Sequence, residues 1–316
     1  MVKLVINIPC FNEENTLPLV LRELPKKIEG IDKTEVQIVD DGSTDKTVEV
    51  AKKFKVDRII RHKKNQGLGI AFREGMQVAL ENGADVFVNI DADNQYPSKY
   101  IPALVKPIIE HRADLVIGNR KPWKVKHFSP LKRMFQWFGN GLTRKIMGSN
   151  VPDTVSGFRA YSKEAMLRIN VVTKFSYVLD TIMQAVQKGL KIESIDIETN
   201  APTRKSRLFK NIFQHMKKSG TNLIRIFYLY EPFKTFFYLS LPFFLIGFGL
   251  IIRWLWLSYI LSIGTQNIQS LIIASISLIT GVLLFALGII GDSLKTNRML
   301  LEDILYKLKK KELEGK

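Results

Sequence analysis

Two aspartates that directly follow an apolar run are the residues in this chain best suited to chemistry. The run VFVNI at 86–90 is followed by DADNQYP, so Asp91 and Asp93 stand two positions apart, with Gln95 two positions further on. Because side chains alternate along a strand, the two carboxylates project to one side and can hold a hard divalent ion, Mg²⁺ or Mn²⁺, with the phosphates it carries. The pattern indicates nucleotide-sugar chemistry. The alternative is that these carboxylates only cap the next helix.

The elements that must position these aspartates alternate along the first 118 residues. Strands are predicted at 2–9, 36–39, 58–61, 86–90 and 115–118, with amphipathic helical stretches between them and a further strand at 191–197. This alternation predicts an α/β, Rossmann-like fold with a mostly parallel sheet and helices on both faces.

Polar residues follow several of these predicted strands. Asn12, Glu13 and Glu14 follow the first, Asp40 and Asp41 the second, and Asn119 and Arg120 the fifth. Ligands bind outside the carboxyl ends of the strands in open sheets of this kind, so we expect these side chains to converge there with Asp91. Asp40 and Asp41 are placed to accept hydrogen bonds from a base or a ribose.

Two of these motifs keep a structural alternative. Ser43, Thr44 or Asp45 is expected to cap the helix that follows Asp41, whatever else the motif does. The segment NQGLGIAFREG at 65–75 opens a helix with two glycines. Those glycines suit phosphate binding at the helix start and close packing of the helix on the sheet equally well.

Two long apolar windows near the C-terminus predict a transmembrane hairpin. They cover 235–257 and 268–290, and their length and near absence of charge favour membrane spans over two buried helices of a soluble core. Arg253 lies close enough to the end of the first window to reach the headgroups. The linker 262–267 has no Lys or Arg, whereas the flanking segments are basic. The catalytic domain and both termini are therefore expected on the cytoplasmic side.

The formal net charge of +17 has two explanations, nucleic acid and anionic lipid. Much of the excess lies beside the predicted hairpin, which favours lipid and argues against a nucleic-acid partner. Apolar residues at helical spacing among Lys and Arg in 204–227 predict basic helices in the membrane interface. The predicted organisation is a catalytic domain at 1–203, interface helices at 204–233, the hairpin at 234–291, and an amphipathic cytoplasmic tail at 292–316 that allows a homo-oligomer.

A series of motifs resembles glycosyltransferase family 2. The motifs are PCFNEE at 9–14, VDDGSTD at 39–45, NQGLGIAFREG at 65–75, DADNQYP at 91–97, GNR at 118–120 and SGFRAY at 156–161. Their order, followed by a membrane hairpin, resembles the branch of the family that transfers hexoses to dolichyl and other polyprenyl phosphates. The resemblance implies the GT-A fold and an inverting, metal-dependent transferase. It favours GDP-mannose as the nucleotide-diphosphate sugar.

The resemblance also implies roles for particular residues. Pro9, Phe11 and Glu13 would line the nucleoside pocket with Asp40 and Asp41, and Asp91, Asp93 and Gln95 would hold the metal. Arg120 and Arg133 would meet a phosphate of the donor or of the lipid acceptor, and Arg204 in RKSRL would close over the donor diphosphate. Arg159 would support the site or brace the fold.

Three functions compete at this point. A lipid phosphate is already anionic and needs no general base, so the first function is transfer to a polyprenyl phosphate. An acceptor hydroxyl on a lipid-linked glycan or glycolipid would need a carboxylate base, for which Asp180 in YVLDTI is the candidate, although a helix cap is an equal explanation. The third is a non-catalytic membrane scaffold.

Overall fold

The computed structural model describes residues 1–121, 151–172, 177–201, 228–260 and 268–315, together with Gly141, Arg144, Gly148 and Thr221. Within these residues lies a seven-stranded sheet with the order β3-β2-β1-β4-β6-β5-β7. The strands are β1 Lys3–Cys10, β2 Lys33–Asp40, β3 Arg58–Arg61, β4 Val86–Asn89, β5 Leu115–Asn119, β6 Arg159–Ser162 and β7 Ile192–Asp196. Every pairing is parallel except the two made by β6. The predicted mostly parallel α/β fold is confirmed.

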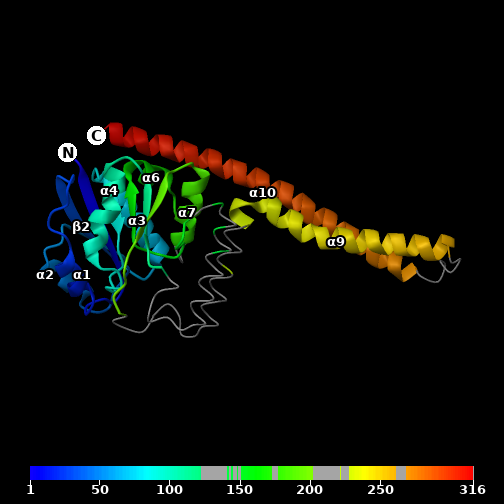
Figure 1. The fold of residues 1–316 in the computed structure, drawn as a ribbon, viewed down its shortest axis with the longest axis horizontal. Helices are drawn as coiled ribbons and strands as arrows, with labels where there is room; N and C mark the ends of the chain where they lie inside the picture. Colours follow the sequence, from blue (N-terminus) through cyan, green and yellow to red (C-terminus); the bar gives the residue numbers. More distant parts are fainter. Residues whose placement is uncertain are drawn as a thin grey trace. The chain divides into compact units, whose positions relative to one another are not determined.

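Helices cover both faces of this sheet (Figure 1). The elements between the strands are α1 Leu17–Glu23, α2 Thr47–Lys53, α3 Leu68–Glu81, η1 Ser98–Tyr100, α4 Ile101–Ile109, α6 Lys163–Arg168 and α7 Val178–Gln187. Side chains of α1, α2 and α4 enter one core with the apolar residues of β1, β2 and β4. On the opposite face Phe72 of α3 stacks on Tyr177 with ring centroids 3.8 Å apart.

The helix α3 packs unusually close to the sheet. Its buried residues recur at helical spacing, and a Cβ added at Gly75 would lie 2.4 Å from Oδ1 of Asn7 in β1. Gln37 Nε2 donates to that same oxygen and to the Gly75 carbonyl, at 2.9 Å each. Asn7 in turn donates to Asn89 of β4 at 2.8 Å. The close-packing interpretation of the 65–75 motif therefore accounts for Gly75.

We expect Gly75→Ala to lower the free energy of unfolding by roughly 1–3 kcal/mol, because the added methyl group overpacks a buried polar network. The gain in helix propensity, about 1 kcal/mol, does not offset it. Thermal melting of the purified full chain measures this. Gly249→Ala, where a Cβ meets no described heavy atom within 4 Å, is the matched control. Equal melting temperatures for the two variants would contradict the packing argument.

The cysteine at the end of β1 is buried. Cys10 is 2% exposed and its thiol lies 3.4 Å from the Ile8 carbonyl. Burial, with the nearby carboxylates of Glu13, Asp40 and Asp45, raises the pKa of this thiol well above its usual value. Cys10 therefore packs as a small apolar side chain.

Contacts divide the chain into two compact units, one of residues 1–210 with 304–316 and one of residues 211–303. In the first unit, the end of the last helix contacts α6 and the residues after it. Tyr306 donates to Glu164 at 3.2 Å, and Lys309 Nζ donates to Asn170 Oδ1 at 2.7 Å. The amphipathic residues of the predicted tail thus have a partner surface in the catalytic unit.

Within the described residues, two helices are long and apolar enough to cross a membrane. They are α9 Pro232–Leu255, continued by the π-helical turn η2 Trp256–Ile260, and α10 Ile268–Glu314. Glycines bring the two helices together. A Cβ at Gly247 would lie 2.6 Å from Leu278, and one at Gly281 would lie 3.2 Å from Phe244. Small residues of this kind let apolar helices approach each other without a core of large side chains.

The helix bounds differ from the predicted segments in one respect. The predicted span and tail, given as separate segments, belong to one 47-residue helix, α10, because its residues after Gly291 keep helical spacing and contain neither glycine nor proline before Gly315. Arg253 is hydrogen-bonded through Nη1 to Ser270 at 3.3 Å, so it pairs with the partner helix. The predicted interface helices at 204–233 lie mostly outside the described residues.

Candidate active site

Two loops that follow β1 and β2 are laced together by side-chain to backbone hydrogen bonds. Ser43 Oγ accepts from the Asn12 amide and Asn12 Oδ1 accepts from the Thr44 amide, both at 2.8 Å. The Glu14 amide donates to Asp45 at 3.1 Å. Asn12 adopts a left-handed conformation with φ 55°, which asparagine tolerates better than most residues. The lacing brings the first two predicted motifs side by side and makes Ser43 and Asp45 loop anchors.

The residues predicted to line the nucleoside pocket lie around these loops. Pro9 is buried in β1 and Phe11 is 38% exposed at its end. Glu13 is buried, and its Oε2 accepts from the Thr16 hydroxyl at 2.6 Å. Asp40 is fully buried. Its Oδ1 accepts from the Ser43 amide, whereas its Oδ2 makes no hydrogen bond to the described residues and lies 3.4 Å from Arg61 Nε. That oxygen retains capacity for a ligand N–H or O–H group.

Asp41 is used differently from Asp40. Its Oδ1 accepts from the Gln66 amide at 2.8 Å and its Oδ2 from the Gly67 amide at 2.9 Å, so it fixes the turn that starts α3. Oδ1 also lies 2.7 Å from Nδ1 of His62. Gly67 has φ 101°, a conformation that glycine adopts without strain. The carboxylate predicted to meet a base or ribose is thus occupied by protein donors.

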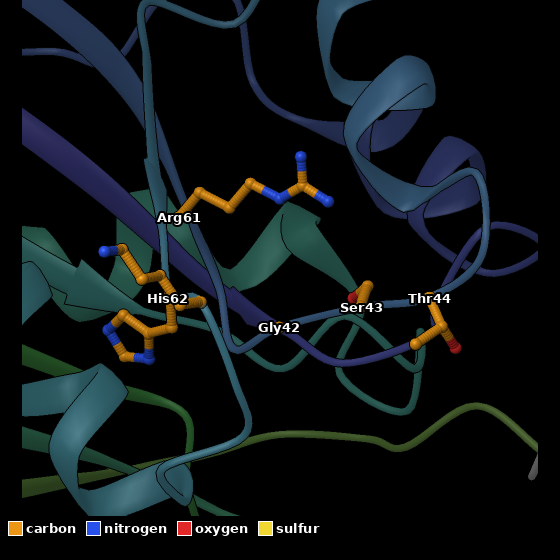
Figure 2. Close-up of a pocket in the computed structure, with 6 residues that line it drawn as sticks. Gly42, Ser43, Thr44, Arg61 and His62 are labelled. Carbon is orange, nitrogen blue, oxygen red and sulfur yellow. The ribbon is translucent and has the colours of Figure 1, made fainter.

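A pocket of about 380 Å³ opens beside these loops. Its lining is Gly42, Ser43, Thr44, Arg61, His62 and Lys63. In Figure 2 the loop residues Ser43 and Thr44 lie across from Arg61 and His62, whose side chains leave the end of β3 in different directions. Gly42 is required in this wall, because a Cβ there would lie 2.7 Å from the Lys64 backbone and its φ is +77°. The sequence reasoning did not select Arg61, His62 or Lys63.

Asp91 and Asp93 follow β4, the strand that neighbours β1. Asp93 Oδ1 accepts from the Gln95 amide at 3.1 Å. This hydrogen bond stabilises a turn directly after β4 and holds Asp93 beside the end of the strand. Asn200 closes this turn by donating to the carbonyls of Asn94 and Gln95 at 3.0 Å each. Burial, and then the charge of Asp93, raise the pKa of Asp91 to about 7.

The surroundings of Asp91 join several strand ends. A Cβ at Gly157 would lie 3.1 Å from Asp91 Oδ2 and 3.0 Å from the Tyr177 hydroxyl, so this glycine admits the carboxylate. Besides Asp93, the charges of Arg120, Glu13 and Arg159 act on Asp91. The predicted convergence of residues from β1, β4 and β5 at one edge is therefore present.

Arg120 makes a paired contact that the sequence did not indicate. Its Nε and Nη2 donate to the two oxygens of Asp153 at 2.7 and 2.9 Å, and its backbone amide donates to the same carboxylate at 3.2 Å. Asp153 is fully buried. A fork-to-fork pair of this kind holds the guanidinium in one orientation. A phosphate would have to approach through the remaining Nη1 edge.

Arg159 braces the fold. It is fully buried and donates to the Ser156 carbonyl at 2.7 Å, to the Val178 carbonyl and the Thr181 hydroxyl at 2.6 Å, and to the Thr154 carbonyl at 3.1 Å. The loop before β6, which carries Gly157 against Asp91, is thereby tied to α7.

Asp180 in α7 is 1% exposed. It accepts from Gln184 Nε2 at 3.2 Å and from the Val172 amide at 3.4 Å. Gln184 also holds the backbone of Asn170, so Asp180 belongs to a network that ties Asn170 and Val172, which follow α6, to α7. Arg133 and Arg204 lie outside the described residues.

The donor set at Asp91 and Asp93 fits a hard divalent ion. Mg²⁺ and Mn²⁺ prefer oxygen ligands, and Mg²⁺ is commonly held by one or two carboxylates with substrate phosphates completing the shell. In the described part of the chain no three His, Cys, Asp or Glu side chains form a metal-sized cluster. The protein would thus supply the two carboxylates, and a phosphate ligand and water would supply the rest.

The mostly parallel sheet, with the acidic pair Asp91 and Asp93 at the end of β4, is typical of nucleotide-sugar transferases with the GT-A fold. The sequence profile of Glycosyl transferase family 2 matches residues 5–169. The chain therefore belongs to glycosyltransferase family 2.

Two relatives and one solved structure are similar to this chain. An undecaprenyl-phosphate mannosyltransferase of Micrococcus luteus is 29% identical over 200 residues, which cover 60% of this chain and 80% of the relative. A UDP-N-acetylglucosamine–dolichyl-phosphate N-acetylglucosaminyltransferase of Methanococcus voltae is 28% identical over 213 residues, covering 61% and 83%. Glucosyl-3-phosphoglycerate synthase of Mycobacterium tuberculosis, solved with Mn²⁺, UDP and phosphoglyceric acid, shares the fold. Its TM-score is 0.55 and its identity 19%, over 71% of this chain and 76% of that one.

Proposed function

We propose that this glycosyltransferase moves a hexose from a nucleotide-diphosphate sugar to a polyprenyl phosphate, with inversion at the sugar. The observation that carries the proposal is that Asp91, beside Asp93, is close enough to feel the charge of Glu13 in the first of the two laced loops. The names of the two polyprenyl-phosphate relatives support this acceptor. The two relatives are named for different sugars, mannose and N-acetylglucosamine. We favour mannose, with GDP-mannose as the donor.

Each part of the site has a defined role in this proposal. Asp40 Oδ2, buried without a hydrogen bond to the described residues, accepts from the nucleoside. Asp91 and Asp93, with Gln95, hold a divalent ion, which when bound neutralises charge on the leaving diphosphate. Arg120, oriented by Asp153, presents its free edge to phosphate, and Arg133 and Arg204 are proposed to do the same. A phosphate acceptor is anionic near neutral pH and attacks without a base.

Membrane attachment is the second half of the proposal. α9 and α10 present large apolar side chains on their surfaces and are packed together by glycines. We propose that they cross the membrane, with the catalytic unit and both termini on the cytoplasmic side, and that this confines enzyme and lipid acceptor to one plane. The basic segment 204–233 is proposed to lie in the interface, as in the predicted domain organisation.

The purified full chain in detergent tests this function directly. With Mn²⁺ and dolichyl phosphate, radiolabelled GDP-mannose is expected to transfer label into the organic phase, whereas UDP-glucose and UDP-N-acetylglucosamine serve as donor controls. EDTA is expected to abolish transfer. Label that appears only as free sugar in the aqueous phase would reject the lipid phosphate acceptor. Absence of any turnover with all three donors would support the scaffold alternative.

Asp180→Asn separates a phosphate acceptor from a hydroxyl acceptor. We expect transfer to dolichyl phosphate to stay within about threefold of wild type, because no base is needed and asparagine keeps an acceptor oxygen for Val172. A melting curve identifies any loss that comes from unfolding. A loss of more than about 100-fold in a folded variant would instead make Asp180 a general base and favour a hydroxyl acceptor.

A further inference from the structure

The ring of His62 is held between two carboxylates in a buried position. Nδ1 lies 2.7 Å from Asp41 Oδ1, and Nε2 lies 2.7 Å from Glu74 Oε2. The side chains of His62 and Asp41 are 3% and 6% exposed, whereas that of Glu74 is 41% exposed. Asp41 comes from the loop after β2, whose next residues line the pocket, and Glu74 comes from α3, so the ring bridges these two elements.

The two short contacts fit a doubly protonated ring. An ionised carboxylate only accepts hydrogen bonds, and a neutral imidazole has one N–H to donate. Both short contacts are hydrogen bonds only when His62 is an imidazolium. Burial acts to lower the pKa of His62, but the hydrogen bonds and charges of Asp41 and Glu74 outweigh it and raise that pKa above its usual value.

The ring acts on the pocket through Asp41. That carboxylate also holds the amides of Gln66 and Gly67, so its position sets the turn into α3. The backbone before this turn packs against Gly42 in the opposite wall, where a Cβ would lie 2.7 Å from Lys64. Loss of the ring's charge therefore leaves one N–H for two carboxylates and removes the cation beside buried Asp41.

We propose that His62, as an imidazolium, is a positioning residue for the sugar donor: it holds Asp41 and the turn at Gln66 and Gly67 in the arrangement that shapes the nucleoside pocket. The proposal rests on the proposed function of that pocket. Because a neutral ring serves one carboxylate only, nucleotide affinity falls as rising pH removes the proton. The basic side chains that flank the ring in the pocket wall are Arg61, 3.4 Å from Asp40, and Lys63.

The test is the pH profile of GDP and UDP affinity for the full chain, measured by calorimetry at saturating Mn²⁺ between pH 6.5 and 8.5. Glu74→Gln offers the ring an amide that pairs equally well with neutral imidazole. We expect it to move the decline in affinity to lower pH, because one of the two carboxylates that raise the pKa of His62 is removed. His62→Gln is expected to remove the decline and to weaken binding about tenfold. Glu81→Gln, at the exposed end of the same helix, is the matched control and should keep the wild-type profile.

Histidine NMR gives a readout that does not depend on the nucleotide. The chain has four histidines, so ¹³C-labelled rings are few enough to assign with the His62→Gln variant. We expect the His62 ring to titrate with a midpoint above 6.5, and Glu74→Gln to lower it. A midpoint at or below 6.5 would overturn the proposal, as would superimposable affinity profiles for wild type and both variants. If neither GDP nor UDP binds the wild-type chain at any pH, the proposed function fails as well.

Discussion

Replacing Asp93 with asparagine is expected to lower the rate of sugar transfer at least about 1,000-fold, because roughly 4 kcal/mol of charge stabilisation on the leaving diphosphate depends on the bound metal. Asparagine keeps an oxygen in the place where Asp93 Oδ1 accepts from the Gln95 amide, so the local turn is preserved and the change removes charge only. The measurement is initial rate of label transfer at saturating Mn²⁺, and EDTA applied to wild type should reproduce the loss.

Asp85→Asn is the matched control for this variant, since Asp85 precedes the same strand at its opposite end, where it accepts from the Lys3 amide. It should leave the rate close to wild type. Electron paramagnetic resonance of Mn²⁺ adds a second check. Protons compete for Asp91, whose pKa is raised to about 7, so wild-type Mn²⁺ affinity should rise from pH 6 to pH 8. An Asp93→Asn enzyme with undiminished activity and Mn²⁺ affinity would exclude this site as the metal site.

Replacing Arg159 with methionine is expected to destabilise the catalytic unit by roughly 3–5 kcal/mol. The guanidinium satisfies three buried carbonyls and one hydroxyl, and methionine fills similar volume but leaves these acceptors without donors. Arg159→Lys should recover only part of the loss, because one ammonium group cannot reproduce the planar fork. Thermal melting of the full chain measures both.

Arg112→Met is the control for Arg159, since Arg112 is half-exposed and pairs with Glu110 and Glu193 at the surface. Its melting temperature should stay near wild type. The buried variant should also lose metal affinity, because the loop tied down by Arg159 carries Gly157 against Asp91. If Arg159→Met and Arg112→Met melted alike, Arg159 would not brace the fold, and the alternative that it supports the site would be favoured.

The strands, and the edge of the sheet that carries the candidate site, could be predicted because the sequence patterns that mark them are local. The run before Asp91 is apolar and short, and β3 has the predicted bounds. β6 was not predicted as a strand because it has four residues, begins with a buried arginine, and is paired on both sides by strands distant in the sequence. Its antiparallel insertion between β4 and β5 departs from simple strand alternation.

The hydrogen-bonded polar pairs at the site could not be predicted, for a related reason. Arg120 and Asp153 are 33 positions apart, and His62 meets Asp41 across 21 positions, so no local pattern marks either pair. A histidine beside basic residues, as in RHKK at 61–64, suggests an exposed charged segment, whereas the fold buries this ring between carboxylates. The rule that polar side chains gather at the ends of parallel strands predicts where the site lies. Which carboxylate pairs with which arginine or histidine depends on contacts between residues far apart in the sequence.

The burial of Cys10 has a practical consequence for labelling. Thiol reagents attack the thiolate, and a thiol that is 2% exposed with a raised pKa offers almost none. Since the sequence contains no other cysteine, the native protein behaves as a cysteine-free background toward maleimides. A single cysteine introduced at any surface position is then a unique reporter, without engineering of the catalytic core.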